Sequence, residues 1–279
     1  MKILIAGGDS NADKRFRSTA YPSLDTSWPK WPELLSEKLN MRTCNTARGG
    51  AGNEYIFSRL QSEIMHIEDK SQIGLVVAGW TQCHRQDWQL DSGNTVFSWA
   101  SQRVHDHGHL IGWMRKTLRY QLALKIMCDA FNIPLIQFHM IHPYDDYIHG
   151  LQPVEADLMF GGKKLDEDRE KYPGNYEKDM NKLVSVILAY DKHLGQDGKF
   201  IGWPVSNKWQ RLYSKVDEDG NDLGFPLDYH LWWEKRLEDR GYLEYVISDL
   251  DVHPSAKGQL LITEFLHGEL EKIYGNRLG

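Results

Sequence analysis

The first apolar run of the chain, residues 2–6, is short and continuous, and two glycines follow it directly. A run of this kind predicts a strand that is buried on both faces and ends in a turn. Similar runs at 73–79 and 133–138 predict further buried strands, and 42–46 predicts a shorter one.

Between these runs the apolar positions recur with the spacing of an amphipathic helix. The helices predicted from this spacing are 31–39, 55–67, 110–131, 182–193, 229–240 and 255–274. Strands that alternate with helices form βαβ units, whose parallel sheet is covered by helices on both faces. The pattern therefore predicts an α/β protein with a parallel sheet.

Polar segments rich in turn residues interrupt this alternation. No Pro-, Ser- or Gly-rich linker divides the chain, which favours one domain over two. We therefore expect a single domain spanning 1–279, with insertions near 86–108 and 144–228.

Composition excludes several classes of protein. The net charge is −6 and the basic residues are scattered, which argues against nucleic acid as a partner. No apolar stretch is long enough for a membrane span, and the N-terminal apolar run is too short for a signal peptide. Three cysteines without C-x-x-C spacing favour core thiols over a disulfide framework. We therefore expect a cytoplasmic or virion-associated protein.

Ser10 is the first candidate for chemistry. It follows the first strand in the sequence Gly7-Gly8-Asp9-Ser10, and open α/β folds bind ligands at the carboxyl ends of their strands. A serine in this position can also serve as a helix N-cap. The surrounding residues lack the G-x-S-x-G pattern of the α/β-hydrolase nucleophile.

His253 is the second candidate, in the loop that enters the terminal helix. Asp251 stands two residues before it and could hold the imidazole in the tautomer that accepts a proton from a serine hydroxyl. The alternative is a surface loop in which Asp251 or Ser255 caps the helix.

A glycine-rich segment, 45–53, follows the second strand. Its backbone N–H groups could stabilise an oxyanion or cradle a phosphate. The segment lacks the Walker lysine pattern and the dinucleotide G-x-G-x-x-G pattern, which makes phosphate the weaker interpretation.

Taken in order, these segments resemble the blocks of the SGNH/GDSL hydrolase superfamily. The matching stretches are Gly8-Asp9-Ser10, Trp31-Pro32-x-Leu34-Leu35, the glycine-rich segment 45–53 and Asp251-Val252-His253-Pro254. The resemblance spans nearly the whole chain and implies a three-layer α/β/α, flavodoxin-like fold. It also implies Ser10 as nucleophile, His253 as base, Asp251 as the orienting acid and Gly50 as an oxyanion donor, with no metal or organic cofactor. Asn53, at the end of the segment, is a further substrate-side candidate.

The resemblance is incomplete after the third strand. The superfamily usually has Gly-x-Asn-Asp there, whereas this chain has Gly79-Trp80-Thr81-Gln82. Thr81 would then be a weaker oxyanion donor than asparagine, and Gln82 is a second candidate. Arg85 could hold an acidic group of the substrate or pair with Asp87.

The acid is also displaced, because the superfamily commonly places it three residues before the histidine, where this chain has Leu250. Other histidines and acids carry less weight. The run 105–109 has possible zinc ligands and 217–222 resembles a calcium loop, but a polar loop and an acidic turn are the favoured interpretations. His139 and His142 could face the site or simply pack in their loop.

We therefore expect a serine esterase that acts on a small-molecule or glycan ester, of the carboxylesterase or glycan O-acetylesterase type. The ten tryptophans and thirteen tyrosines suit either a core or a surface that stacks on sugar rings. The alternative is a catalytically weak or inactive binding or structural protein on the same fold, such as a virion component. The sequence leaves the oligomeric state open.

Overall fold

The structure is a computed structural model of the chain. It describes residues 1–89, 95–98, 110–141, 185–187, 189–201, 203, 244–248, 250, 251 and 253–275.

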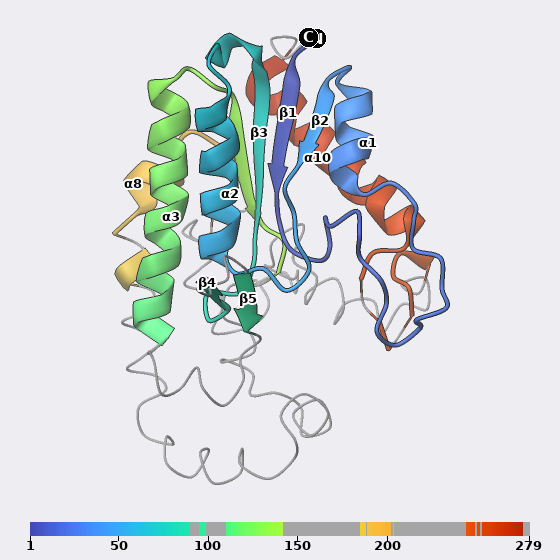
Figure 1. Cartoon of the computed structure of the whole chain (residues 1–279). Helices are drawn as coiled ribbons and strands as arrows, with labels where there is room; N and C mark the ends of the chain where they lie inside the picture. The colour runs from blue at the N-terminus through green and yellow to red at the C-terminus, as the bar shows by residue number, and fades with distance from the viewer. Residues whose placement is uncertain are drawn as a thin grey trace, which may run out of the picture.

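A five-stranded parallel sheet forms the centre of the molecule, in the order β2-β1-β3-β6-β7 (Figure 1). The strands are β1 (Ile3–Gly7), β2 (Arg42–Asn45), β3 (Ile73–Trp80), β6 (Leu135–His139) and β7 (Phe200–Ile201). Every residue of β1, β3 and β6 is buried, because helices cover both faces of the sheet.

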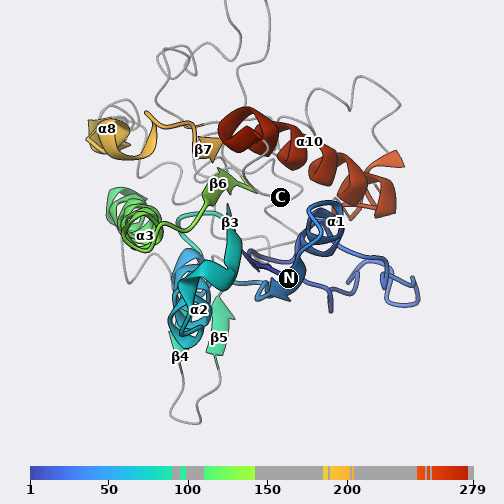
Figure 2. The ribbon, with the colours of Figure 1, turned by 90° about the horizontal axis from the view of Figure 1, so that it is seen from above.

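The helices lie in two layers, seen from above in Figure 2. One layer contains α2 (Asn53–His66), α3 (Leu110–Ala130) and the short α8 (Asp191–Leu194), and the other contains α1 (Trp31–Lys38) and α10 (Ala256–Tyr274). This arrangement confirms the expected three-layer α/β/α fold.

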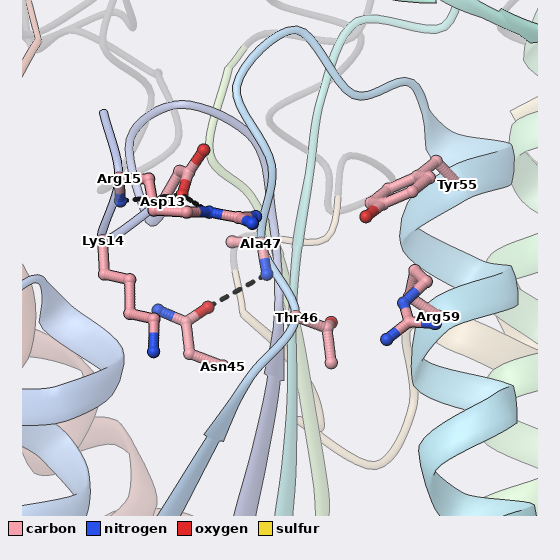
Figure 3. A pocket seen from close by; sticks show the side chains of 8 residues that line it. All are labelled: Asp13, Lys14, Arg15, Asn45, Thr46, Ala47, Tyr55 and Arg59. Atoms are coloured by element: carbon pink, nitrogen blue, oxygen red, sulfur yellow. Dashed lines mark hydrogen bonds and ion pairs between the residues drawn. The ribbon is translucent and has the colours of Figure 1, made fainter. Parts of the chain in front are cut away.

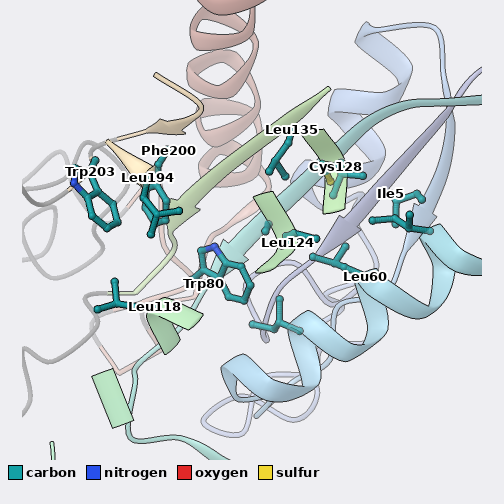
Figure 4. Packing of buried hydrophobic residues seen from close by; sticks show 14 of the residues in the cluster. Ile5, Leu60, Trp80, Leu118, Leu124, Cys128, Leu135, Leu194, Phe200 and Trp203 are labelled. Carbon is teal, nitrogen blue, oxygen red and sulfur yellow. The ribbon is translucent and has the colours of Figure 1, made fainter. Parts of the chain in front are cut away.

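Two apolar cores fill the spaces between the layers. Successive strand residues point to opposite faces, so Ile5 packs in the core under α2 and α3, while Leu4 packs in the core under α1 and α10. Figure 4 shows Leu60 of α2 and Leu124 of α3 packed in the first core with Trp80 at the end of β3. Helix α2 buries Ile56, Leu60 and Ile64, at the spacing of one helical face.

Two regions differ from the periodicity-based expectation. The segment 86–98, expected to be loop, contains the antiparallel strands β4 (Gln86–Gln89) and β5 (Thr95–Ser98). Strand β7 lies within the expected insertion 144–228 and extends the central sheet. The short 3₁₀ helix η1 (Lys70–Gln72) precedes β3. The predicted helix 229–240 lies outside the described residues.

Two features of composition have structural counterparts. Cys44, Cys83 and Cys128 are free thiols. Among the described helices none combines the length and apolarity that crossing a membrane requires.

Candidate active site

Ser10 lies in a tight turn at the carboxyl end of β1, the second strand of the sheet. The N–H groups of Ala12 and Asp13 both donate to the carbonyl oxygen of Asp9, each at 3.1 Å. The turn passes close to its own start, because a Cβ at Gly8 would lie 3.1 Å from the Ala12 Cβ. The turn thus holds the Ser10 side chain at the sheet edge with 6% of its surface exposed.

The opposite end of the chain brings His253 to this serine. The Ser10 Oγ lies 2.8 Å from His253 Nε2, and His253 Nδ1 lies 2.6 Å from Asp251 Oδ1. Because Nδ1 donates its proton to the carboxylate, the neutral ring has Nε2 free to accept the Ser10 proton. Ser255 is the N-cap of α10 and accepts from the Gly258 N–H at 3.2 Å, so capping does not occupy Asp251.

Asp251 is buried and held by several donors. Its Oδ2 accepts a short hydrogen bond from the Ser18 hydroxyl, and its Oδ1 also accepts from the His253 N–H at 3.2 Å. Burial acts to raise the pKa of Asp251, but hydrogen bonds from His253 and Ser18 outweigh it and lower the pKa below its usual range. Asp251 is therefore an ionised acid suited to orient an imidazole.

The Phe16 ring packs against the imidazole ring of His253. The two ring centroids are 4.2 Å apart with an interplanar angle of 31°. The Phe16 carbonyl oxygen accepts from the Thr26 hydroxyl at 2.5 Å, which ties together the loop between β1 and α1. This contact restricts the plane of the His253 ring.

The backbone N–H groups of Ser10 and Gly50 are the candidate oxyanion donors. Gly50 has a φ of +80°, a conformation that glycine adopts readily. Neither N–H donates to an acceptor within the described part of the chain. The neighbouring Gly49 lies against Ser10, because a Cβ there would be 3.8 Å from the Ser10 Cβ. The glycine-rich loop is thus beside Ser10.

Thr81, which the sequence suggested as a weak oxyanion donor, uses its hydroxyl in another contact. Its side chain is completely buried, and its hydroxyl donates to Asp9 Oδ2 at 3.0 Å. The buried carboxylate of Asp9 needs donors, and it also receives the Asn11 N–H and side-chain amide at 3.0 and 2.9 Å. The single proton of the Thr81 hydroxyl is therefore committed to Asp9 rather than to an oxyanion.

Arg85 and Gln82 belong to the same buried network. Arg85 Nη1 lies 3.2 Å from Asp9 Oδ2, and Arg85 Nε donates to Gln82 Oε1 at 2.9 Å. The suggested partner Asp87 instead accepts from the N–H groups of Gly52 and Tyr55 at 2.7 and 2.8 Å. Arg85 thus joins the segment after β3 to the turn that carries Ser10.

Asn53 has a structural position as well. Its amide donates to the carbonyl oxygen of Thr81 at 3.0 Å and to the Thr117 hydroxyl at 3.1 Å, and its oxygen accepts from the Thr81 N–H at 2.9 Å. These bonds join α2 to the end of β3 and to α3.

The structure describes one of the remaining candidates, His139. His139 is buried beside Phe200, and burial lowers its pKa to about 3. The run 105–109, the segment 217–222 and His142 lie outside the described residues. Within the described ranges no three His, Cys, Asp or Glu side chains gather in a way that could hold a metal ion.

Sequence reasoning missed Ser18, Phe16 and the network around Asp9. Ser18 is 233 residues from Asp251, and no local pattern marks it. Asp9 was visible only as part of the nucleophile segment, where a carboxylate beside a buried strand could have signalled a need for donors.

Comparisons with known proteins find similarity in structure only. No protein-family model and no curated protein matches the chain. The solved structure of TesA matches with 13% identity and a TM-score of 0.46, covering 98% of this chain and 99% of that one. The psychrotrophic esterase EstA from Pseudoalteromonas sp., inhibited by monoethylphosphonate, matches with 11% identity and a TM-score of 0.44, covering 99% and 100%. A protein assigned to the G-D-S-L lipolytic family from Desulfitobacterium hafniense matches with 13% identity and a TM-score of 0.39, covering 97% and 100%. The solved structures that match the chain thus include an esterase and a protein of the G-D-S-L family.

Proposed function

We propose that the protein is a serine hydrolase that cleaves an ester through an acyl-enzyme on Ser10. One observation carries the proposal: Ser10, His253 and Asp251 form an unbroken chain of hydrogen bonds, with distances of 2.8 and 2.6 Å. A serine hydroxyl in contact with a base, which a third group orients, is the arrangement that activates a nucleophile.

In the acylation step, Ser10 Oγ attacks the ester carbonyl carbon while its proton moves to His253 Nε2. The carbonyl oxygen becomes an oxyanion, which the N–H groups of Ser10 and Gly50 stabilise. The tetrahedral intermediate then breaks its bond to the alcohol oxygen, and that oxygen takes the proton from His253. Asp251 stabilises the imidazolium that exists between the two proton transfers.

In the deacylation step, a water molecule attacks the acyl-enzyme and gives its proton to His253. The second tetrahedral intermediate breaks the bond to Ser10 Oγ, which recovers the proton from the imidazolium. The acid leaves and the starting state of the site is restored.

A carboxylic ester of a small molecule or an O-acetylated glycan fits this site. Two exposed aromatic side chains support the glycan alternative: Tyr21, whose N–H donates to the Ser18 hydroxyl at 2.9 Å, and Trp88 on β4. Aromatic faces that remain open to solvent can stack on sugar rings.

Hydrolysis of p-nitrophenyl acetate tests the proposal. Ser10→Ala and His253→Ala should each lower kcat/KM by at least about 10³-fold, because Ser10, His253 and Asp251 would act together and each variant removes one of the three. Ser58→Ala is the matched control, since Ser58 is exposed on α2 and its variant should retain full activity. Equal residual rates in the wild type and Ser10→Ala would reject Ser10 as the nucleophile.

One observation favours a second candidate function, a catalytically weak or inactive binding protein on the same fold. The Thr81 hydroxyl is committed to Asp9, which leaves two backbone donors for an oxyanion. Loss of one such donor costs about 10²–10³ in turnover in other enzymes. Binding of an ester without Ser10-dependent turnover would favour this function.

A further inference from the structure

A polar pocket opens beside the nucleophile turn, at the edge of the sheet formed by β2 (Figure 3). Its volume is about 310 Å³, and its walls come from the nucleophile turn, the end of β2 and one face of α2. The lining residues are Asp13, Lys14, Arg15, Asn45, Thr46, Ala47, Tyr55 and Arg59. The proposed mechanism uses none of them.

Positive charge predominates in this pocket. Lys14, Arg15 and Arg59 are three cations against the single carboxylate of Asp13. That carboxylate is buried and already accepts the backbone N–H groups of Gly49 and Arg15, both at 2.9 Å, and it pairs with Arg15 Nε at 3.4 Å. The local excess is unusual for a chain whose net charge is −6.

The cations retain hydrogen-bonding capacity for a ligand. Lys14 is exposed and has no carboxylate partner within the described residues. Arg59 pairs with Glu63 through one guanidinium nitrogen at 2.9 Å, an exposed contact between successive turns of α2. Such pairs contribute little free energy, so a bound anion could replace this one at small cost.

The pocket shares a wall with the proposed oxyanion site. Asp13 lines the pocket and accepts the Gly49 N–H, and a Cβ on Gly49 would lie 3.6 Å from Asp13 Oδ2 and 3.8 Å from the Ser10 Cβ, so Gly49 touches both residues. Lys14 and Arg15 belong to the same short segment that carries Ser10. A substrate whose ester lies at Ser10 can therefore reach the pocket with another part of the same molecule.

We propose that this pocket binds an anionic oxygen group of the ester substrate: a carboxylate, a sulfate or a phosphate. This inference rests on the proposed esterase function and adds to it a substrate class, esters that carry a negative charge. Arginine matches the geometry of these groups through two parallel hydrogen bonds, and lysine adds a point charge. The positive potential also attracts such substrates toward the site.

The test uses a series of ω-acetoxyalkanoates with increasing numbers of methylene groups, each paired with its neutral primary amide. The ratio of kcat/KM for acid over amide measures the preference for charge, and comparison between variants removes differences in intrinsic reactivity. The variants are Lys14→Gln and Arg59→Gln. The matched control is Arg42→Gln, because Arg42 is an exposed cation at the opposite end of β2.

We expect the acid-to-amide ratio of kcat/KM to be highest at one chain length. It should fall about tenfold in each pocket variant, while kcat/KM for ester cleavage in the neutral amide substrate stays unchanged. The control should keep the wild-type ratio. The same series ending in sulfate or phosphate then identifies the preferred anion.

An acid-to-amide ratio that is the same in the wild type and in the Lys14 and Arg59 variants would overturn the pocket proposal. If Ser10-dependent cleavage of the acetate ester in the amide substrates is intact, the esterase function stands. Calorimetry with the Ser10→Ala variant separates the two further. An acid of the series that binds to Ser10→Ala, and binds about tenfold more weakly once Arg59→Gln is added, would support the pocket even if no ester is hydrolysed. Absence of binding at millimolar acid would reject it.

Discussion

The hydroxyl of Thr81 donates to the carboxylate of Asp9 at 3.0 Å, and both side chains are completely excluded from solvent. The contact joins the end of β3 to the turn that carries Ser10. Thr81 therefore supports the nucleophile through Asp9, and the proposed oxyanion site consists of the Ser10 and Gly50 N–H groups.

Thr81→Val tests this relationship. Valine has nearly the same shape but leaves Asp9 without one donor, which should lower the free energy of unfolding by about 1–3 kcal/mol. Thr81→Ser should retain most of the stability, while the larger Thr81→Asn should destabilise a site that is already filled. Urea denaturation and ester hydrolysis measure the two effects. Unchanged stability with a hundredfold slower hydrolysis in Thr81→Val would instead place Thr81 at the oxyanion.

Ser18 should act as a positioning residue through Asp251. Ser18→Ala removes a donor to the ionised carboxylate, so the pKa of Asp251 should rise toward its usual range. We expect kcat to fall about 3- to 10-fold, and the loss of activity that protonation of Asp251 causes should begin at a higher pH than in the wild type.

Ser18→Thr keeps a hydroxyl and should restore the wild-type pH profile. A lower melting temperature in Ser18→Ala without any change in the pH profile would show that Ser18 serves stability alone.

Lys30 should make the stability of the fold depend on pH. Burial lowers its pKa to about 8 from the ordinary 10.5, although Glu33, Asp13 and Asp25 act in the opposite direction. Between these values the unfolded chain binds more protons than the folded one, so stability rises with pH. The cost of burying the charged amine is thus complete below about pH 8 and is relieved toward pH 10.5.

The comparison is between the wild type and Lys30→Met in urea at about pH 7 and about pH 10. The wild type should gain on the order of 1–3 kcal/mol relative to the variant over this interval. The Lys30 amine donates to the Thr26 carbonyl oxygen at 2.7 Å, and this contact is lost in the variant at both pH values. If the difference in free energy of unfolding between the wild type and Lys30→Met is the same at both pH values, Lys30 keeps an ordinary pKa.

Activity should survive chelation. In the proposed mechanism Ser10 supplies the nucleophile and His253 the base, so the acyl-enzyme route requires no metal-bound water. Turnover of p-nitrophenyl acetate is measured before and after dialysis against EDTA. Loss of turnover that zinc restores would assign a catalytic role to the histidine run 105–109.

The centre of the sheet was predictable because β1, β3 and β6 are fully buried and appear as continuous apolar runs. The short edge strand β7 was not, since two residues, Phe200 and Ile201, are too few to show a period. The hairpin was missed for another reason: β4 reads Gln-Asp-Trp-Gln, and such a polar strand forms by pairing with its partner rather than by burying an apolar face.

The position of Ser10 near His253 was predictable, because the carboxyl ends of parallel strands meet at one sheet edge. The orientation of Thr81 was not, since it depends on the unmet hydrogen bonds of the buried Asp9 carboxylate. The contact between Ser18 and Asp251 depends on how the loop before α1 folds over the sheet edge, and no sequence period records that.

Labelling with a fluorophosphonate probe tests most directly whether Ser10 is an activated nucleophile. The serine oxygen forms a bond to phosphorus and fluoride leaves, and peptide mass spectrometry locates the adduct. A single adduct on Ser10 is expected in the wild type and in Ser58→Ala, none in Ser10→Ala, and at least about 10²-fold slower labelling in His253→Ala. An unlabelled wild type, or equal labelling of Ser10→Ala, would contradict the proposed function.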